Sequence, residues 1–423
     1  MTDGLQAALV EAIREAPAWP FGLYVHIPYC PYRCPYCDFN AYRLSSRADS
    51  DAVVEAILRE AEAWAALASR ARGRFRTLFL GGGTPTVLTA EQIGRLLPGL
   101  RQRLPCEGVV EVTVEANPGT LTPAKVEVLL AEGVNRVSLG VQSLDAGELQ
   151  RLGRLQTPDQ VRRSVRLLRQ AGVANLNVDL IFAIPGQTPE SLRRTLECAL
   201  DEFDPEHVSA YCLTVEEGTP FHELHEQGRL VLPDVDAQAE MYRTVVDHLA
   251  RAGLMRYEVS NFARKGCESE HNLNYWRHGD YLGLGPGAHS FWEKFRFATV
   301  ASPPAYAGAA ERFSAGAGAS FAFVERLTAR QLMDERIMLG LRLAEGVDRQ
   351  RFYADFGCWP EEAYPAPLWD RLEQTGLILR EAGRIRLTDE GFLVADAIIR
   401  EIAARGAGEH ALTGGASTPE RAR

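Results

Sequence analysis

The sequence predicts an α/β protein: an incomplete (β/α)6 barrel followed by a small helical, winged-helix-like domain. Between about residues 20 and 260, short apolar segments alternate with amphipathic segments of helical period, which is typical of βα units with a parallel sheet. After about residue 300 the pattern changes to helix, hairpin and helix. With 423 residues and 46% apolar side chains, the chain can form one large domain and a smaller one.

Six strands and six helices are expected to alternate in the barrel. The expected strands are Tyr24–Ile27, Thr77–Leu80, Val110–Glu115, Arg136–Gln142, Asn177–Phe182 and Val208–Leu213. The expected helices are Asp51–Ser69, Glu91–Leu100, Pro123–Ala131, Pro158–Ala171, Pro189–Leu200 and Ala237–Ala252. Three of these helices start at the proline of a Thr-Pro pair, which indicates an N-cap threonine followed by a proline in the first turn.

Changes in composition along the sequence indicate where the chain divides into segments. We expect an N-terminal extension at 1–20, the barrel at 21–260, a linking segment at 261–300, a C-terminal domain at 301–404 and a disordered tail at 405–423 that is rich in Gly, Ala, Ser and Thr. The C-terminal domain is expected to contain helices at Leu327–Leu343, Pro367–Thr375 and Phe392–Ala404 and a hairpin at Leu377–Leu387.

Charge and cysteine content limit the classes of function. A net charge of -10 argues against a nucleic-acid partner, because such proteins usually carry a basic surface. The N-terminus has no secretory leader pattern, and no apolar stretch approaches the roughly 18 residues that span a bilayer. Eight cysteines, of which five are scattered, fit a reducing compartment. We therefore expect a cytoplasmic protein. Only three of the 46 basic residues are lysine, so no single arginine is assigned a function unless a motif contains it.

The three clustered cysteines are the most informative feature. Cys30, Cys34 and Cys37 form a CxxxCxxC loop directly after the first strand. Three thiolates are one too few to complete a tetrahedral zinc site or an iron-sulfur cube, so another ligand must complete the centre. A zinc site with a distant fourth ligand, or three buried thiols, are the alternatives. His26, inside the strand, is expected to be structural or to support this loop.

Other polar or glycine-rich residues also follow the expected strands. The segment Gly81–Thr86 follows the second strand, Glu115 ends the third, Gln142 ends the fourth and Asp179 lies in the fifth. In barrels of this kind, function gathers at the carboxyl ends of the strands. Each motif alone could be an ordinary turn or a helix cap, but their joint occurrence predicts one site.

These motifs resemble the radical S-adenosylmethionine (SAM) superfamily, and within it the oxygen-independent coproporphyrinogen III dehydrogenase-like group, over residues 20 to 300. The resemblance implies a [4Fe-4S] cluster held by Cys30, Cys34 and Cys37, whose fourth iron binds SAM. A reduced cluster, supplied by an electron donor, then cleaves SAM to a 5'-deoxyadenosyl radical.

The resemblance also implies the residues that surround the cofactors. Tyr24 and Tyr36 correspond to aromatic residues beside the cluster, and Glu115 would accept hydrogen bonds from SAM. The loop that faces SAM consists of Gly82, Gly83 and Thr84. Porphyrinogen dehydrogenases hold a second SAM, and the matching positions here are Gln142, Arg154 and Asp179. Arg154 would offer a planar donor fork to a carboxylate.

One departure changes the expected function. The porphyrinogen dehydrogenases have a fourth cysteine where this chain has Phe39. This difference and the segment Glu270–Trp276 resemble the heme-chaperone branch, the HemW type, which implies heme as a ligand and a heme-acceptor protein, which could be membrane-associated, as a partner. His271 is then the expected ligand of heme iron. Alternatively, His271 only helps to close the last loop of the barrel.

Three functions therefore remain open. The favoured one is a heme chaperone with a cluster and SAM. The second is a radical enzyme that oxidatively decarboxylates coproporphyrinogen III, and the third is a zinc-stabilised barrel with a regulatory winged helix.

Overall fold

The computed structural model describes residues 2–313 and 321–405, which form two compact units. The first unit comprises Met1–Tyr275 and Gly279–Arg326, and the second comprises Trp276–His278 and Leu327–Arg423. The expected disordered tail lies outside the described residues except for Arg405.

A sheet of twelve strands, counted over the described residues, forms the centre of the first unit. Its six central strands are parallel and follow the order of the sequence. They are β1 (Gly22–Ile27), β4 (Thr77–Gly82), β5 (Glu111–Ala116), β6 (Arg136–Gln142), β7 (Asn175–Phe182) and β8 (His207–Cys212). The six-strand parallel sheet predicted from the sequence is therefore confirmed.

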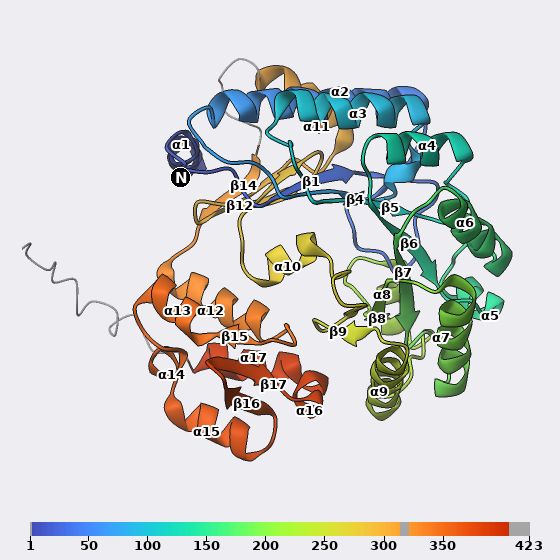
Figure 1. The fold of residues 1–423 in the computed structure, drawn as a ribbon, viewed down its shortest axis with the longest axis vertical. Coiled ribbons are helices and arrows are strands. Elements are labelled where there is room, and N and C mark those ends of the chain that lie inside the picture. Colours follow the sequence, from blue (N-terminus) through green and yellow to red (C-terminus); the bar gives the residue numbers. More distant parts are fainter. Residues whose placement is uncertain (1, 314–320, 406–423) are drawn as a thin grey trace, which may run out of the picture. The chain divides into compact units, whose positions relative to one another are not determined.

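The helices between these strands lie along the outer side of the curved sheet (Figure 1). They are α2 (Arg47–Leu67), α3 (Ala90–Arg103), α4 (Pro123–Ala131), α6 (Pro158–Gln170) and α7 (Pro189–Phe203), and α9 (Val235–Arg251) follows β8. The side chains of Thr122, Thr157 and Thr188 accept hydrogen bonds from the backbone in the first turn of α4, α6 and α7, each followed by proline. The N-caps read from the Thr-Pro pairs are thus confirmed. Shorter helices, η1 (Pro85–Val87), α5 (Ala146–Arg151) and α8 (Pro220–Glu226), lie in the loops after β4, β6 and β8.

The edges of the sheet were not predicted. Next to β1 lies β11 (Tyr281–Leu284), which is parallel to it, followed by the antiparallel strands β12 (His289–Trp292), β13 (Phe295–Thr299) and β14 (Phe321–Arg326). At the other edge, β10 (Asn261–Ala263) is antiparallel to β8, and β9 (Met255–Arg256) is antiparallel to β10.

Two boundaries differ from those expected. Residues 301–313 and 321–326 belong to the first unit, because β14 pairs with β13 and α11 (Pro303–Phe313) packs along α2. The N-terminal extension forms α1 (Thr2–Arg14), and its Leu9 and Ile13 are fully buried in the core. Both segments are apolar enough to add to the main core, so the composition change near residue 300 does not mark the domain boundary.

The second unit has the helix, strand, helix and hairpin order of a winged-helix-like fold. A three-stranded antiparallel sheet contains β15 (Val347–Asp348), β17 (Arg384–Leu387) and β16 (Ile378–Glu381), in this order. The helices are α12 (Ala329–Gly340), α13 (Arg349–Phe356), α14 (Pro360–Ala363), α15 (Ala366–Gln374), α16 (Asp389–Leu393) and α17 (Ala395–Ala404). The expected last helix is thus two helices, because the chain turns at Val394. Among the described residues of the whole chain, no helix has the length and apolar character that a membrane crossing requires.

Candidate functional site

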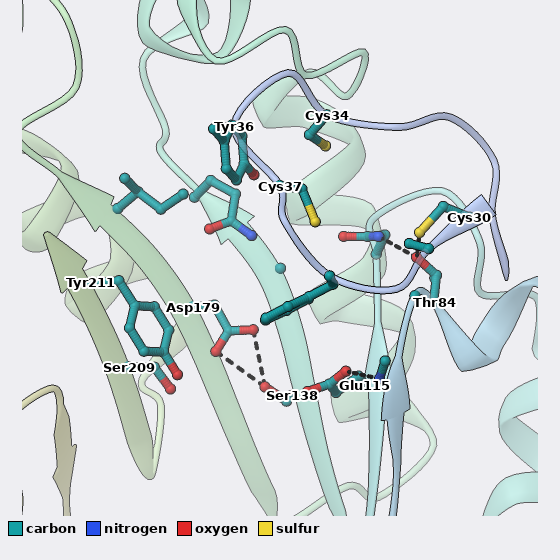
Figure 2. A pocket seen from close by; sticks show the side chains of 18 of the residues that line it. Cys30, Cys34, Tyr36, Cys37, Thr84, Glu115, Ser138, Asp179, Ser209 and Tyr211 are labelled. Atoms are coloured by element: carbon teal, nitrogen blue, oxygen red, sulfur yellow. Dashed lines mark hydrogen bonds between the residues drawn. The ribbon is translucent and has the colours of Figure 1, made fainter. Parts of the chain in front are cut away.

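A cavity of about 390 Å³ lies at the carboxyl ends of the parallel strands. Figure 2 shows the cysteine loop on one side of this cavity and the strand residues Glu115, Ser138 and Asp179 on the other. Among the described residues, Tyr24 and His271 are the predicted site residues that do not line it. Those that do are Cys30, Cys34, Tyr36, Cys37, Gly82, Gly83, Thr84, Glu115, Gln142, Arg154 and Asp179. The structure therefore brings most of the separate motifs together.

The cysteine loop is held in shape by two short strands, β2 (Tyr29–Cys30) and β3 (Tyr42–Arg43). The amide of Cys37 donates to the carbonyl of Cys34 over 3.2 Å, and the amide of Leu44 donates to the carbonyl of Cys30 over 3.0 Å. Burial raises the pKa of the Cys30 and Cys37 thiols. These thiols therefore stay protonated until a metal centre displaces their protons.

The spacing of the three thiols bears on the kind of metal centre. In the described part of the chain, no three His, Cys, Asp or Glu side chains are placed to hold a single metal ion. A tetrahedral zinc with bonds of about 2.3 Å would bring its sulfur ligands to roughly 4 Å from one another. A four-iron cube binds each thiolate through a different iron and so accepts a wider spacing. Three thiols that line one cavity match the donor set of a cluster that leaves one iron open.

A short chain of hydrogen bonds connects β1 to the end of the cysteine loop. The hydroxyl of Tyr24 donates to Nδ1 of His26 over 2.9 Å, and Nε2 of His26 donates to the carbonyl of Asn40 over 2.9 Å. The side-chain amide of Asn40 donates in turn to the carbonyls of Pro286 and Ala301. Tyr24 thus supports the loop through His26 rather than lining the cavity, and His26 has the supporting role expected of it.

The glycine loop after β4 is bonded to the start of the cysteine loop. The amide of Gly83 donates to the carbonyl of Ile27, and the amide of Thr84 donates to that of Tyr29, each over 2.8 Å. A Cβ atom on Gly83 would lie 2.6 Å from the Tyr29 carbonyl oxygen, so only glycine fits there. These bonds keep Gly82, Gly83 and Thr84 directly beside the thiols.

The hydroxyl of Thr84 links Asn117, which directly follows β5, to Cys30. Asn117 Nδ2 donates to Thr84 Oγ1 over 2.6 Å, which leaves the hydroxyl proton to point at Cys30 Sγ, 3.4 Å away. Such a donor would stabilise a thiolate at Cys30.

Two carboxyl groups lie opposite the cysteines. Oε2 of Glu115 accepts from the amide of Gly82 over 3.1 Å, and Asp179 accepts from the hydroxyl of Ser138 over 3.0 Å and from Asn177 over 2.7 Å. Burial, with the nearby charge of Asp179, raises the pKa of Glu115 to about 8. Burial also raises the pKa of Asp179. A cationic ligand would be favourable here because it would stabilise both carboxylates.

Both terminal nitrogens of the Arg154 guanidinium form hydrogen bonds within the protein, so they are not a free pair of donors facing the cavity. Its Nη1 donates to Cys34 Sγ over 3.2 Å, and its Nη2 donates to Asn117 Oδ1 over 2.6 Å and to the carbonyl of Gly140 over 3.0 Å. Gln142 stands at an irregularity between β6 and β7 with a left-handed φ of 67°. A bulge of this kind re-aims a side chain at the end of a strand.

His271 lies on α10 (Glu270–Trp276), outside the cavity lining and only 1% exposed. Its Nδ1 is 2.7 Å from the hydroxyl of Thr77 and its Nε2 is 2.7 Å from that of Tyr275. Its ring stacks on Phe79 with centroids 5.0 Å apart. Burial lowers the pKa of His271 to about 3. Both ring nitrogens are thus occupied, and in this conformation His271 has no lone pair to offer to iron.

Several lining residues were not singled out from the sequence. They are Asn117, Arg136, Ser138, Asn177, Ser209, Tyr211 and Asn272. Ser138 and Asn177 stand two residues from Gly140 and Asp179, so the alternation of a strand could have pointed to them. Phe39, noted only as a departure from a cysteine pattern, lines the cavity and is 61% exposed.

Comparison with known proteins identifies the fold and the domains of the chain. Residues 24–199 match the family model of the Radical SAM superfamily, and residues 327–394 match the HemN C-terminal domain. The E. coli structure described as coproporphyrinogen III oxidase (HemN), a radical SAM enzyme, aligns with a TM-score of 0.80 over 93% of this chain and 92% of its own, at 23% identity. At that identity the likeness shows the fold alone.

Curated relatives define the family more narrowly. The heme chaperone HemW of Bacillus subtilis is 36% identical over 376 residues, which is 89% of this chain and 97% of the relative. That of Escherichia coli is 41% identical over 64% of this chain and 70% of its own length. The mitochondrial radical S-adenosyl methionine domain-containing protein 1 of Mus musculus is 34% identical over 90% of this chain and 86% of its own. The similarity extends over both units, and the chain therefore belongs to the heme chaperone HemW family within the radical SAM superfamily.

Proposed function

We propose that this protein is a heme chaperone that holds a [4Fe-4S] cluster with SAM in its cavity and passes heme to an acceptor protein. One observation carries the cofactor part: Cys30, Cys34 and Cys37 line the same cavity as the glycine loop and Glu115. The heme part is supported by the HemW relatives, which match nearly the whole chain.

In this proposal each group of residues has a defined task. The three cysteines bind three irons of the cluster, and Tyr36 packs beside it. Gly82, Gly83, Thr84 and Glu115 bind the polar end of SAM, because they combine a close backbone approach with a buried acceptor. Gln142, Arg154 and Asp179 border the space for a second small molecule. When bound, the cluster and SAM would supply one-electron chemistry, for which an electron donor is needed.

The proposal also names partners and a location. Heme and a heme-acceptor protein, which could be membrane-bound, are the partners. A nucleic acid is not, given the net charge of -10. The cytoplasm is the proposed compartment, and the eight free thiols are consistent with its reducing conditions.

The test is a hemin titration of anaerobically reconstituted protein, with iron and sulfide analysed on the same sample. We expect about four irons and four sulfides per chain and a Soret band that saturates with hemin. A triple Cys30, Cys34 and Cys37→Ala variant serves as the cluster-free control, and transfer is followed by mixing the heme-loaded protein with an apo-hemoprotein. Iron without sulfide, or no Soret band, would contradict the proposal.

A second candidate function is the oxidative decarboxylation of coproporphyrinogen III by a radical SAM enzyme. It is favoured by one observation: Gln142, Arg154 and Asp179, the expected contacts of a second SAM, line the same cavity. It is disfavoured by Phe39 in place of the fourth cysteine. Anaerobic incubation with coproporphyrinogen III, SAM and a reductant, followed by product analysis, separates the two functions, since a chaperone would release no decarboxylated porphyrinogen.

A further inference from the structure

His289 belongs to a row of side chains that crosses three strands on one face of the sheet. His289 of β12 is paired in register with Ala298 of β13, which is paired in turn with Phe323 of β14. Side chains alternate between the two faces of a strand, and the opposite face of β12 carries Trp292, which packs on Trp64 of α2. The His289 row (His289, Ala298 and Phe323) therefore lies on the face turned away from α2.

Both ends of the His289 row are open to solvent. His289 is exposed, and Phe323 is 37% exposed. Their ring centroids are 5.4 Å apart, and the small Ala298 lies between them in the register. A register shift between β13 and β14 places Phe321 against the main core and leaves Phe323 on the other face. A flat apolar ligand can therefore rest on Phe323 and reach the imidazole.

The imidazole of His289 has no hydrogen bond to any other group of the described chain. Of the eight histidines that the structure describes, six bond through a ring nitrogen, and His222 and His289 do not. Both nitrogens of His271 are occupied. In this conformation His289 thus offers a lone pair to a metal, whereas His271 does not.

A positive charge lies beside this imidazole. Arg296 is paired in register with Phe291, which is two residues after His289, so Arg296 is on the same face. Partial burial and the charge of Arg296 lower the pKa of His289. The ring is therefore mostly neutral near pH 7, and the neutral ring is the form that binds metal ions. These surroundings suit a ligand that combines a metal ion with acidic groups.

The His289 row is separate from the cavity beside the cysteine loop. Among the described residues, the three of the row do not line that cavity. The cavity, with a volume of about 390 Å³, is near the lower end of the range for ligand pockets, and the proposed cluster and SAM occupy it. A further large ligand therefore requires another place on the protein.

We propose that His289 binds the iron of heme, with Phe323 packed against the porphyrin. The inference rests on the proposed function, which supplies heme as the ligand. Imidazole is a common axial ligand of heme iron, and an aromatic ring packs well on a porphyrin. The assignment of His289 does not depend on whether His271 also becomes available, because iron has two axial positions. An exposed site also lets an acceptor protein reach the heme directly.

Hemin and metal-free protoporphyrin IX separate the role of the iron from that of the porphyrin. The two molecules share the ring and the propionates and differ in the metal. Dissociation constants are measured on the full chain as wild type, H289Q and F323A. H222Q is the matched control, because within the described residues His222, on α8, also has a ring without a hydrogen bond and lacks an aromatic neighbour.

We expect H289Q to bind hemin at least about tenfold more weakly, because loss of even an outer-shell partner costs that much in metal affinity. Its affinity for protoporphyrin IX should stay that of the wild type. F323A should bind both molecules about threefold more weakly, and H222Q should match the wild type. Pulsed EPR of ferric heme in protein with isotope-labelled histidine should lose the coupling of one imidazole in H289Q and keep it in F323A.

Several results would overturn this inference. Unchanged hemin affinity and imidazole coupling in H289Q would do so and leave the proposed function intact, since the wild type would still bind heme. Equal losses for hemin and protoporphyrin IX in H289Q, or a large drop in its melting temperature, would show a role other than binding iron. Weaker hemin binding in F39A, at a cavity residue, with H289Q unchanged would place heme in the cavity. If the wild type gave no Soret band with hemin, the proposed function would fall as well.

Discussion

Arg154 donates a hydrogen bond to the thiol sulfur of Cys34, 120 residues earlier in the chain, over an N–S distance of 3.2 Å. The same guanidinium also bonds to Asn117 and Gly140. It therefore ties the cysteine loop to β6 and to the loop after β5. A donor at a sulfur also stabilises the thiolate form that binds iron.

We expect R154M to retain less iron than the wild type after reconstitution. The substitution removes the donor at Cys34 and the donor to Asn117 Oδ1, at a cost of about 1–3 kcal/mol for the unpaired oxygen, whereas the carbonyl of Gly140 keeps its bond from Gln156 Nε2. The measurement is iron per chain together with the melting temperature. R151M, at an exposed arginine of α5, is the control. Wild-type iron content in R154M would show that the Arg154–Cys34 contact is not needed for the cluster.

The substitution G83A tests the contact between the glycine loop and the cysteine loop. An alanine Cβ would meet the Tyr29 carbonyl at 2.6 Å, so one of the two loops must move. We expect a loss of more than about 1 kcal/mol of stability and impaired cluster assembly, measured by denaturant unfolding and by iron content. G94A, on the exposed side of α3, where the added Cβ has 3.6 Å to its nearest neighbour, should be neutral or stabilising. Equal behaviour of the two variants would contradict the close fit at Gly83.

The role of His271 as a heme ligand stays a prediction, and Y275F tests it. Because the Tyr275 hydroxyl occupies Nε2, iron must displace a hydrogen bond worth about 1 kcal/mol to reach that nitrogen. We therefore expect Y275F to bind hemin about fivefold more tightly and H271A to lose the ligand-dependent Soret shift. If Y275F and H271A both titrate like the wild type, the imidazole is a structural group and heme binds elsewhere.

The buried carboxyl group of Glu60 makes the stability of the fold depend on pH in a specific way. It is fully buried and accepts from Trp64 Nε1 over 3.3 Å, from the amide of Gly285 over 3.0 Å and from the hydroxyl of Tyr306. Burial raises the pKa of Glu60 from 4.5 to about 7. Since the folded state binds this proton more tightly, the stabilisation is complete below pH 4.5 and is lost as the pH rises to about 7.

This difference corresponds to about 3 kcal/mol. We expect the free energy of unfolding of the wild type to fall with pH over this range more steeply than that of E60Q, which has no proton to lose. The comparison requires unfolding curves for both proteins at several pH values between 4 and 8. Parallel pH profiles would mean that Glu60 titrates normally.

The periodicity of apolar residues predicts the parallel strands and their helices, but it does not predict the strands at the edges of the sheet. The parallel strands β4 to β8 are apolar runs separated by long helices, so each has a clear pattern. The edge strands β9, β10 and β11 have only two to four residues, which is too short for alternation to be recognised. The boundary expected at 301 precedes the observed one at Arg326, because β14 is defined by pairing with β13 and not by its own composition.

The spacing of the motifs predicts which residues meet at the cavity. It predicts their hydrogen-bond partners less well. The imidazole of His271 is occupied by Thr77, 194 residues away, and no local pattern reveals such a contact.

The anchoring of Asn40 has a consequence for biogenesis. Its side chain bonds to the carbonyls of Pro286 and Ala301, which are 246 and 261 residues later. During synthesis on the ribosome, the segment that carries the cysteines emerges early, but the groups that fasten it emerge only after more than two thirds of the polypeptide has been made. The three sulfurs therefore reach their final geometry only late in synthesis or after it, and any metal centre built on that geometry has to follow.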